Sequence, residues 1–242
     1  MGTRSTWRRL RGYPLVLASI VVSYGFTAAQ ASASPSLVAL AAQLLTVAAA
    51  LHAAGVRRRT EAVGDAALGI VLLVTIAAFA MGQPGTVLAV GLSVAAAAAY
   101  LFALVVIIAS ELRGRRIDAR TLWAAVCAYL LIGMFFTYVF SAIALTGGPL
   151  FGGREPDAIT DVLFFSFTTM TTTGYGNVVP VEAGAQSVAI CEAVVGQLFL
   201  VTVVARVVTG WERRPRLRED AVDDDPGRAA GPEPSHSRGD VP

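Results

Sequence analysis

The sequence contains no lysine, two cysteines and two histidines, and charged residues occupy only 15% of its 242 positions. Cys127 and Cys191 both lie inside apolar runs, where burial as small hydrophobic side chains is expected rather than a disulfide framework. His52 and His236 are isolated, which argues against a metal site. No phosphate-binding glycine loop and no cluster of nucleophile, base and acid occurs, so neither an enzyme nor a cofactor is expected.

Hydrophobic residues, by contrast, make up 55% of the sequence, and its mean hydropathy is +0.63. Such a composition favours a chain that folds in a lipid bilayer. The apolar residues fall into blocks of about 18 to 25, the length that a helix needs to cross a hydrocarbon core. We therefore expect an all-α, polytopic membrane protein with six transmembrane helices, at 13–30, 37–56, 63–81, 87–110, 121–145 and 186–208.

A different kind of segment, 147–185, separates the last two of these helices. It opens with a Gly-Gly-Pro turn and contains an apolar run at 158–170 that is too short to span a bilayer. We expect a re-entrant pore helix at 161–171, with Asp161 favourably placed near its positive N-terminal end. An irregular loop must follow it, and such backbone survives at membrane depth only where it lines a wet path or is buried in protein.

Arginines orient these helices, because cytoplasmic loops hold the excess of basic residues. They gather before the first helix and after the second, fourth and sixth helices, whereas the remaining short loops contain only Arg154. Both termini are therefore expected to be cytoplasmic, in a multi-pass protein of the plasma membrane. Anionic lipids are the expected partners of the basic loops, and no nucleic acid is expected.

The N-terminal segment allows one alternative interpretation. Arg8 and Arg9, followed by an apolar stretch and the small residues at 31–34, are also typical of a cleavable signal peptide. Cleavage would leave five helices with the C-terminus still inside. The apolar stretch is long for a signal core, which favours a retained helix.

The segment 168–177, with the sequence Thr-Thr-Met-Thr-Thr-Thr-Gly-Tyr-Gly-Asn, resembles the filter of the potassium-channel pore family. The resemblance covers about 121–208, from the outer helix to the inner helix. It implies a passive K⁺ channel that assembles as a homotetramer. It also implies a filter made of Thr172, Thr173, Gly174, Tyr175 and Gly176, in which the carbonyls of the first four residues and the Thr172 hydroxyl bind the ions.

Physical chemistry explains why such a filter needs these residue types. A dehydrated cation must find oxygen atoms in place of its water, and consecutive carbonyls face one axis only if the backbone alternates between ordinary and left-handed conformations. Gly174 and Gly176 permit positive φ angles at low steric cost. One chain supplies one strip of carbonyls, so a closed ring requires several copies related by cyclic symmetry. An extracellular turn that conducts no ion is the competing interpretation, since tight turns also use glycine freely.

Residues around the motif are expected to support the filter. Tyr175 should point away from the ion path and pack against Phe164 and Phe165, at a place where the family more often has tryptophans. Asn177 stands where the family most often has aspartate, which predicts altered inactivation or blocker sensitivity rather than lost selectivity.

The last helix contains four further candidates. Glu192 is expected to bond hydroxyls behind the filter, such as those of Thr168 or Thr169, or else to contact water at the outer rim. Gly196 is either a gating hinge or a close-packing site. Leu200 and Val204 are candidate residues of the cavity lining.

The chain thus divides into five parts: a cytoplasmic N-terminus (1–12), a four-helix sensor-like domain (13–110), a basic linker (111–120), the pore domain (121–209) and a disordered cytoplasmic tail (210–242). The stretch 87–110 has no charged residue, so weak or no intrinsic voltage gating is expected. Two other functions stay open. A weakly selective cation channel needs only a relaxed filter, whereas a potassium-uptake transporter subunit usually has four pore loops and this chain has one.

Overall fold

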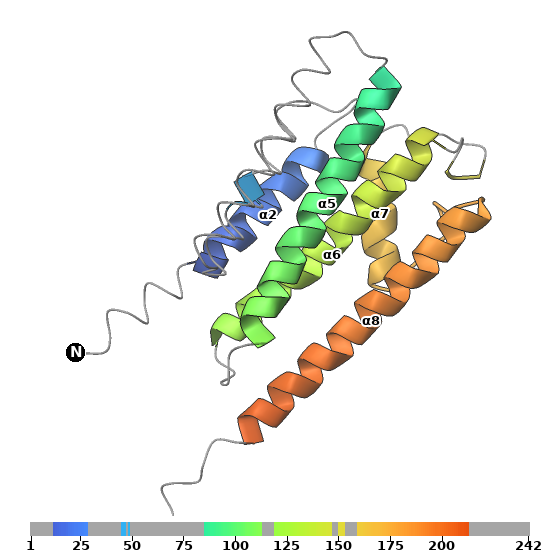
Figure 1. Ribbon diagram of the computed structural model, residues 1–242. Helices are drawn as coiled ribbons and strands as arrows, with labels where there is room; N and C mark the ends of the chain where they lie inside the picture. The colour runs from blue at the N-terminus through green and yellow to red at the C-terminus, as the bar shows by residue number, and fades with distance from the viewer. Residues whose placement is uncertain are drawn as a thin grey trace, which may run out of the picture.

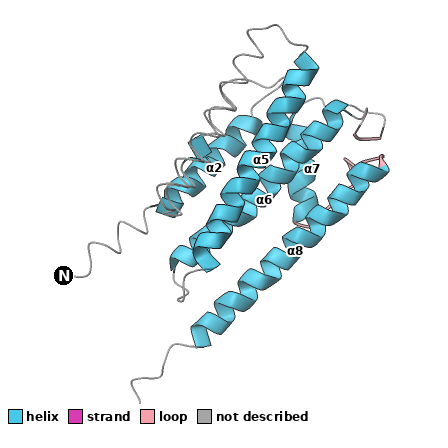
Figure 2. Ribbon diagram, in the orientation of Figure 1, coloured by secondary structure: helices cyan, strands magenta, loops and turns pink. Residues whose placement is uncertain are grey.

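The computed structural model describes helices and two short irregular segments, 150–152 and 171–182 (Figure 2). The residues that it describes are 12–28, 45, 46, 48, 85–112, 119–146, 150–152 and 159–212. The expected helix at 63–81 lies outside these residues, and so does the one at 37–56 apart from 45, 46 and 48, which are helical. The N-terminus before 12 and the tail after 212 also lie outside them.

Each described helix overlaps a helix expected from the sequence. They are α2 (Gly12–Ala28), α5 (Gly85–Leu112), α6 (Ala119–Thr146), α7 (Ile159–Met170) and α8 (Ala183–Glu212). The ends differ most for α8, which extends beyond the expected 186–208 at both ends. An apolar run marks only the part of a helix suited to hydrocarbon, and the backbone bonds of the helix continue past it.

Among the described residues, three helices are long and apolar enough to cross a membrane: Gly85–Glu111, Thr121–Thr146 and Ala183–Val208. Tyr13–Ala28 and Ile159–Met170 are apolar but shorter. The described part of the chain is therefore all-helical with three candidate membrane spans, and the expected total of six stays a prediction.

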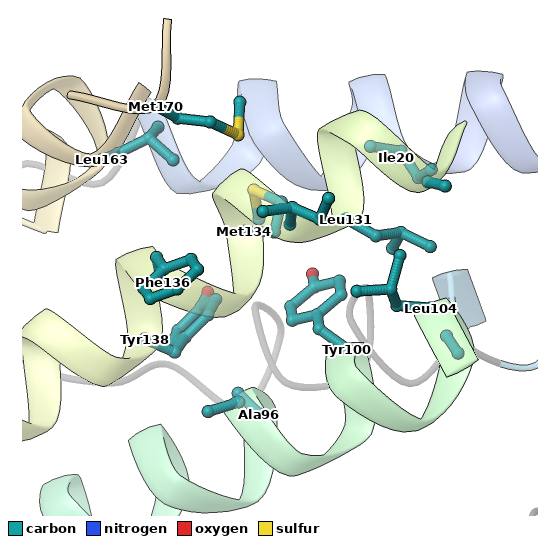
Figure 3. Packing of buried hydrophobic residues seen from close by; sticks show 14 of the residues in the cluster. Ile20, Ala96, Tyr100, Leu104, Leu131, Met134, Phe136, Tyr138, Leu163 and Met170 are labelled. Carbon is teal, nitrogen blue, oxygen red and sulfur yellow. The ribbon is translucent and has the colours of Figure 1, made fainter. Parts of the chain in front are cut away.

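Helix α6 lies at the centre of the bundle. It packs along α5 and also contacts α2, α7 and α8, while α7 fills only one end of the space between α6 and α8 (Figure 1). Apolar side chains of α2, α5, α6 and α7, together with Ala185 of α8, form the core that holds this arrangement together, and Figure 3 shows part of it. Among them are Ile20 of α2, Tyr100 and Leu104 of α5, Leu131 and Met134 of α6, and Leu163 and Met170 of α7.

Polar contacts around Glu111 join the helices at the end of the bundle where α5 stops. The Glu111 carboxylate accepts hydrogen bonds from the Tyr13 hydroxyl at 2.9 Å and from Thr121 Oγ1 at 3.1 Å. Arg206 Nη2 donates to the Glu111 carbonyl oxygen at 3.4 Å. These bonds connect α2, α6 and α8 to the end of α5.

The segment between α6 and α8 has its two ends paired with each other. Phe151 and Pro180 form an isolated antiparallel bridge, and the Val181 amide donates to the Leu150 carbonyl at 3.2 Å. The start and the end of this segment therefore lie side by side. Between them the chain descends through α7 and comes back through the Gly-Tyr-Gly loop (Figure 1).

Candidate functional site

Helix α7 ends in a backbone motif that also begins the Gly-Tyr-Gly loop. The Thr172 amide donates to the Thr169 carbonyl at 2.9 Å, and the Thr173 amide donates to the Thr168 carbonyl at 2.8 Å. With a φ of 56° at Thr172, these bonds make a Schellman motif. Glycine usually occupies that left-handed position. A β-branched threonine there is strained, which is a feature that clusters at functional sites.

Left-handed backbone recurs at every second residue of the loop. Gly174 has a φ of 49° and Gly176 a φ of 76°. A Cβ added to either glycine would meet no atom within 4 Å, so the backbone angle alone calls for glycine there. The expected alternation of ordinary and left-handed conformations is thus present. Residues 172–176 are all exposed in the single chain, and ion binding by their carbonyls stays a prediction.

The two phenylalanines expected beside Tyr175 have different neighbours. The Phe164 ring stacks on the Tyr175 ring, with centroids 5.7 Å apart and planes 14° apart. Phe165 instead makes edge contacts with Phe140 of α6, at 5.0 Å, and with Phe151, at 5.3 Å. Phe164 therefore contacts the loop, whereas Phe165 holds α7 against α6 and the start of the loop segment.

Glu192 lies fully buried where α8 faces α6 and α7. Ser166 Oγ lies 2.6 Å from Glu192 Oε1 and 2.9 Å from the Gly133 carbonyl oxygen. The partner of Glu192 in the structure is thus Ser166, two and three residues before Thr168 and Thr169, whose hydroxyls the sequence suggested. Glu192 Oε2 is buried and has no hydrogen-bond partner among the described atoms. The side chain is enclosed by protein and does not lie at a wet rim.

Gly196 of α8 lies directly against the end of α7. A Cβ at this position would lie 2.7 Å from the Met170 carbonyl oxygen and 2.8 Å from Met170 Cγ. Real Cβ atoms do not approach a backbone oxygen so closely. The structure therefore gives Gly196 a close-packing role, and a hinge at the same residue stays a prediction.

Gln197, the next residue along α8, reaches the loop. Its Nε2 donates to Thr172 Oγ1 at 3.3 Å. Gln197 and Ser166 are not among the residues expected from the sequence, although a sequence signal was present for each. Gln197 is an amide inside an otherwise apolar stretch of α8, and Ser166 is a hydroxyl on the apolar short helix α7.

The remaining candidates lie on either side of the loop. Leu200 and Val204 follow Gln197 along α8 and are exposed in the single chain. Asn177 is exposed and lines a cavity of about 350 Å³ beside Asp161. Thr168 supports the loop through its carbonyl, which accepts from the amides of Thr173 and Gly174.

Comparisons with known proteins find sequence similarity around this site. Residues 124–210, from α6 to α8, match the family model Ion_trans_2, described as an ion channel. Protein LctB of Bacillus caldotenax is 29% identical over 106 residues, which are 41% of this chain and 78% of LctB. Potassium channel subfamily K member 1 is 44% identical in Mus musculus and 42% identical in Homo sapiens, each over 62 residues. That match covers 24% of this chain and only 18% of those channels.

The matched residues include the whole arrangement described above: the capped helix α7, the alternating loop and the helices on both sides of it. The apolar helices suit a multi-pass membrane protein. The match over 124–210 therefore indicates a channel protein of the membrane rather than an enzyme.

Proposed function

We propose that this chain is a subunit of a homotetrameric potassium channel and that 172–176 is its selectivity filter. K⁺ is the conducted substrate. It binds to the carbonyls of Thr172, Thr173, Gly174 and Tyr175 and to the Thr172 hydroxyl, and it moves by knock-on between these sites without covalent chemistry. The potassium channels among the matched relatives support the choice of ion.

The observation that carries the proposal is the alternation of φ at Thr172, Gly174 and Gly176. Positive φ at every second residue turns successive carbonyls toward one side of the strand, as a row of dehydrating oxygen ligands requires. The row begins directly at the C-terminus of α7. The partial negative charge at that end, about half an elementary charge, favours a cation next to it.

The same geometry supports an oligomer with cyclic symmetry, and the resemblance to potassium channels implies four subunits. Each chain supplies one row of carbonyls, and an ion must be surrounded on all sides, so copies related by cyclic symmetry complete the ring. Tyr175 is 71% exposed in the single chain, although its aromatic ring suits a buried place. A neighbouring subunit would cover it.

The membrane layout completes the proposal. Six helices span the plasma membrane with both termini in the cytoplasm, α7 is a re-entrant pore helix, and basic loops contact anionic lipids. The pairing of Leu150 with Val181 supports the re-entrant path, because it brings both ends of the segment to one side. The first four helices form a domain without gating charges.

A weakly selective cation channel is the second candidate. One observation favours it: the ring packed on Tyr175 is Phe164, which has no N–H or O–H to brace the filter by a hydrogen bond. A filter held by stacking alone is more compliant. Reversal potentials with K⁺ on one side and Na⁺ on the other would separate the two candidates. A reversal potential near zero would favour the weakly selective channel, because it means that both ions pass almost equally well.

The main test is cation flux into proteoliposomes made with purified protein. We expect K⁺ uptake well above Na⁺ uptake, and loss of K⁺ selectivity in Gly174→Ala, because left-handed backbone costs a residue with a Cβ roughly 1 to 2 kcal/mol in each subunit. Gly184→Ala is the matched control, since its added Cβ also meets nothing within 4 Å but the position lies in a helix. Equal flux for K⁺ and Na⁺ in the wild type, or no flux above that of empty vesicles, would contradict the proposal.

Subunit number needs a separate measurement. Native mass spectrometry of the protein released from lipid nanodiscs should give a mass of about four chains. A monomer in lipid would exclude the proposed pore, because a single row of carbonyls cannot enclose an ion.

A further inference from the structure

Gln197 is the polar side chain of α8 that reaches the proposed filter. Its amide donates to Thr172 Oγ1 at 3.3 Å, and this hydroxyl donates in turn to the Thr171 carbonyl at 2.7 Å. A hydroxyl has one hydrogen and two lone pairs. With its hydrogen directed to Thr171 and one lone pair to Gln197, a single lone pair is left to face an ion.

The packing of α8 on α7 fixes this contact. Gly196 lies so close to the Met170 carbonyl that no side chain fits between the two helices. The register of α8 is thus set at the last residue of α7, two positions before Thr172. Gln197 has little freedom to slide past Thr172 unless the two helices separate.

Thr172 is also the residue of the loop that most needs support. Its φ of 56° places a β-branched side chain in the left-handed region, where the cost is high. A hydrogen bond to its hydroxyl limits the rotation of the side chain and so favours this conformation over alternatives.

The surroundings of Gln197 also indicate which way it faces. An amide pointing into hydrocarbon would lose its hydrogen bonds to water at a large cost, so Gln197 does not face lipid in a membrane. Val201, Val204 and Val208 follow it at helical spacing and are exposed in the single chain. This face of α8 therefore suits a water-filled cavity, with the amide at the end nearest the filter.

We propose that Gln197 is a positioning residue for the innermost cation site, and that four copies of it form an amide ring at the entrance to the filter. The Nε2 end of each amide orients the Thr172 hydroxyl. The Oε1 end faces the cavity, where it can accept hydrogen bonds from the water around an arriving cation. This inference rests on the proposed potassium channel.

The test is Ba²⁺ block of K⁺ current from the side of the cavity, because Ba²⁺ resembles K⁺ in size and carries twice the charge. Gln197→Met keeps the length of the side chain and removes the amide. We expect it to weaken the block by about two- to tenfold, the effect of one hydrogen bond. Gln197→Glu keeps the length and adds negative charge beside the cavity, so it should tighten the block. Opposite shifts in the two variants are the expected result.

Gln186→Met is the matched control, since it makes the same chemical change on the same helix where Nε2 bonds the Pro180 carbonyl instead. A double-mutant cycle with Thr172→Val tests whether Gln197 acts through the Thr172 hydroxyl. If Gln197 only stabilised the fold, its effect on Ba²⁺ block would not depend on that hydroxyl. The effect of Gln197→Met on Ba²⁺ block should be much smaller when the hydroxyl is absent, because the part that acts through Thr172 is then lost.

Three outcomes would overturn the inference. In the first, Gln197→Met matches the control in Ba²⁺ block. In the second, the two substitutions at Gln197 shift the block in the same direction. In the third, the effect of Gln197→Met persists at full size in Thr172→Val. All three presume K⁺ current in the wild type. Absence of that current would reject the potassium channel itself, so the two failures are distinguishable.

Discussion

Helices α6 and α8 are similar in length and both are apolar enough to span a membrane, yet the chain treats them very differently. Of the best spanning window in α6, 56% of the residues are buried by the rest of the chain, whereas in α8 the figure is 11%. Helix α6 is enclosed by α5 on one side and by α2 and α7 on others. Within the described part of the chain, it is the helix against which the others pack.

Helix α8 instead touches its own chain along one stripe. Ala185, Glu192 and Gly196 lie on that stripe and are buried, and most of the remaining surface of the helix is exposed. In the proposed tetramer, that remaining surface faces neighbouring subunits, lipid and the cavity. The difference teaches that substitutions in α6 should act mainly on folding, whereas substitutions on the stripe of α8 should act on the filter that it braces.

Two glycines give the largest contrast. Gly133 of α6 and Gly196 of α8 both approach α7, but a Cβ on Gly133 would meet the tip of the Phe167 ring at 2.7 Å, whereas one on Gly196 would meet the Met170 backbone. A ring can turn away and a backbone carbonyl cannot. Gly196→Ala should therefore cost about 1 to 3 kcal/mol and abolish most K⁺ flux, with Gly133→Ala less harmful.

Flux assays at equal amounts of assembled protein, with thermal unfolding beside them, would compare the two variants. Gly91→Ala on α5 serves as the control, since nothing lies within 4 Å of the added Cβ. A larger loss of K⁺ flux and thermal stability in Gly133→Ala than in Gly196→Ala would contradict the proposed difference between α6 and α8.

The buried bond between Ser166 and Glu192 comes next in expected size. Ser166→Ala leaves a buried carboxyl group without its described partner, which costs about 1 to 3 kcal/mol. We expect faster inactivation of K⁺ current, because the bond holds α8 against the helix that leads into the filter. Glu192→Gln keeps the shape and retains a hydrogen bond, so its effect on inactivation should be smaller.

A double-mutant cycle measures this contact directly. If the two side chains act as a unit, the double variant Ser166→Ala with Glu192→Gln should differ from the sum of the single effects by at least 0.5 kcal/mol, roughly the limit of additivity for independent sites. Strict additivity would mean that Glu192 does not act through Ser166.

The two phenylalanines of α7 give a smaller contrast. Phe164→Leu removes a ring stacked on Tyr175, worth about 0.5 to 1.5 kcal/mol beyond its buried area, and should change ion selectivity or inactivation with little change in thermal stability. Phe165→Leu removes edge contacts to Phe140 and Phe151, so it should lower stability instead. If the two variants changed selectivity, inactivation and thermal stability to the same extent, the two rings would have the same role, contrary to this prediction.

The sequence predicted the described helices and the left-handed backbone at Gly174 and Gly176, because apolar runs and positive φ at glycine are local properties of the chain. Ion binding by the loop stays a prediction. The sequence could not predict which helix faces pack against each other. Phe164 and Phe165 are adjacent and chemically identical in the sequence, and only the packing of α7 on α6 shows that they have different neighbours. Glu192 bonds Ser166 rather than Thr168 or Thr169, because this pairing depends on how α8 packs against α7, which a local sequence pattern does not show.

The left-handed conformation of Thr172 was likewise missed. Threonine rarely adopts it, and local preference points elsewhere. The hydrogen bonds that close α7 override that preference, together with the one from Gln197, which lies 25 residues away in sequence. Such a long-range contact leaves no trace in a local pattern.

Voltage dependence should show the smallest effect of all. Helix α5 covers much of α6, and between Gly85 and Leu112 its one charged residue is Glu111, at its end. A helix moves in response to voltage only through charges that cross the field, each worth about 2.3 kcal/mol per 100 mV. We therefore expect α5 to act as a fixed wall, and the K⁺ conductance of the reconstituted protein to be nearly independent of voltage between −100 and +100 mV. A steep dependence of conductance on voltage would mean that α5 and its neighbours move during gating. It would then contradict the interpretation of α6 as a static support.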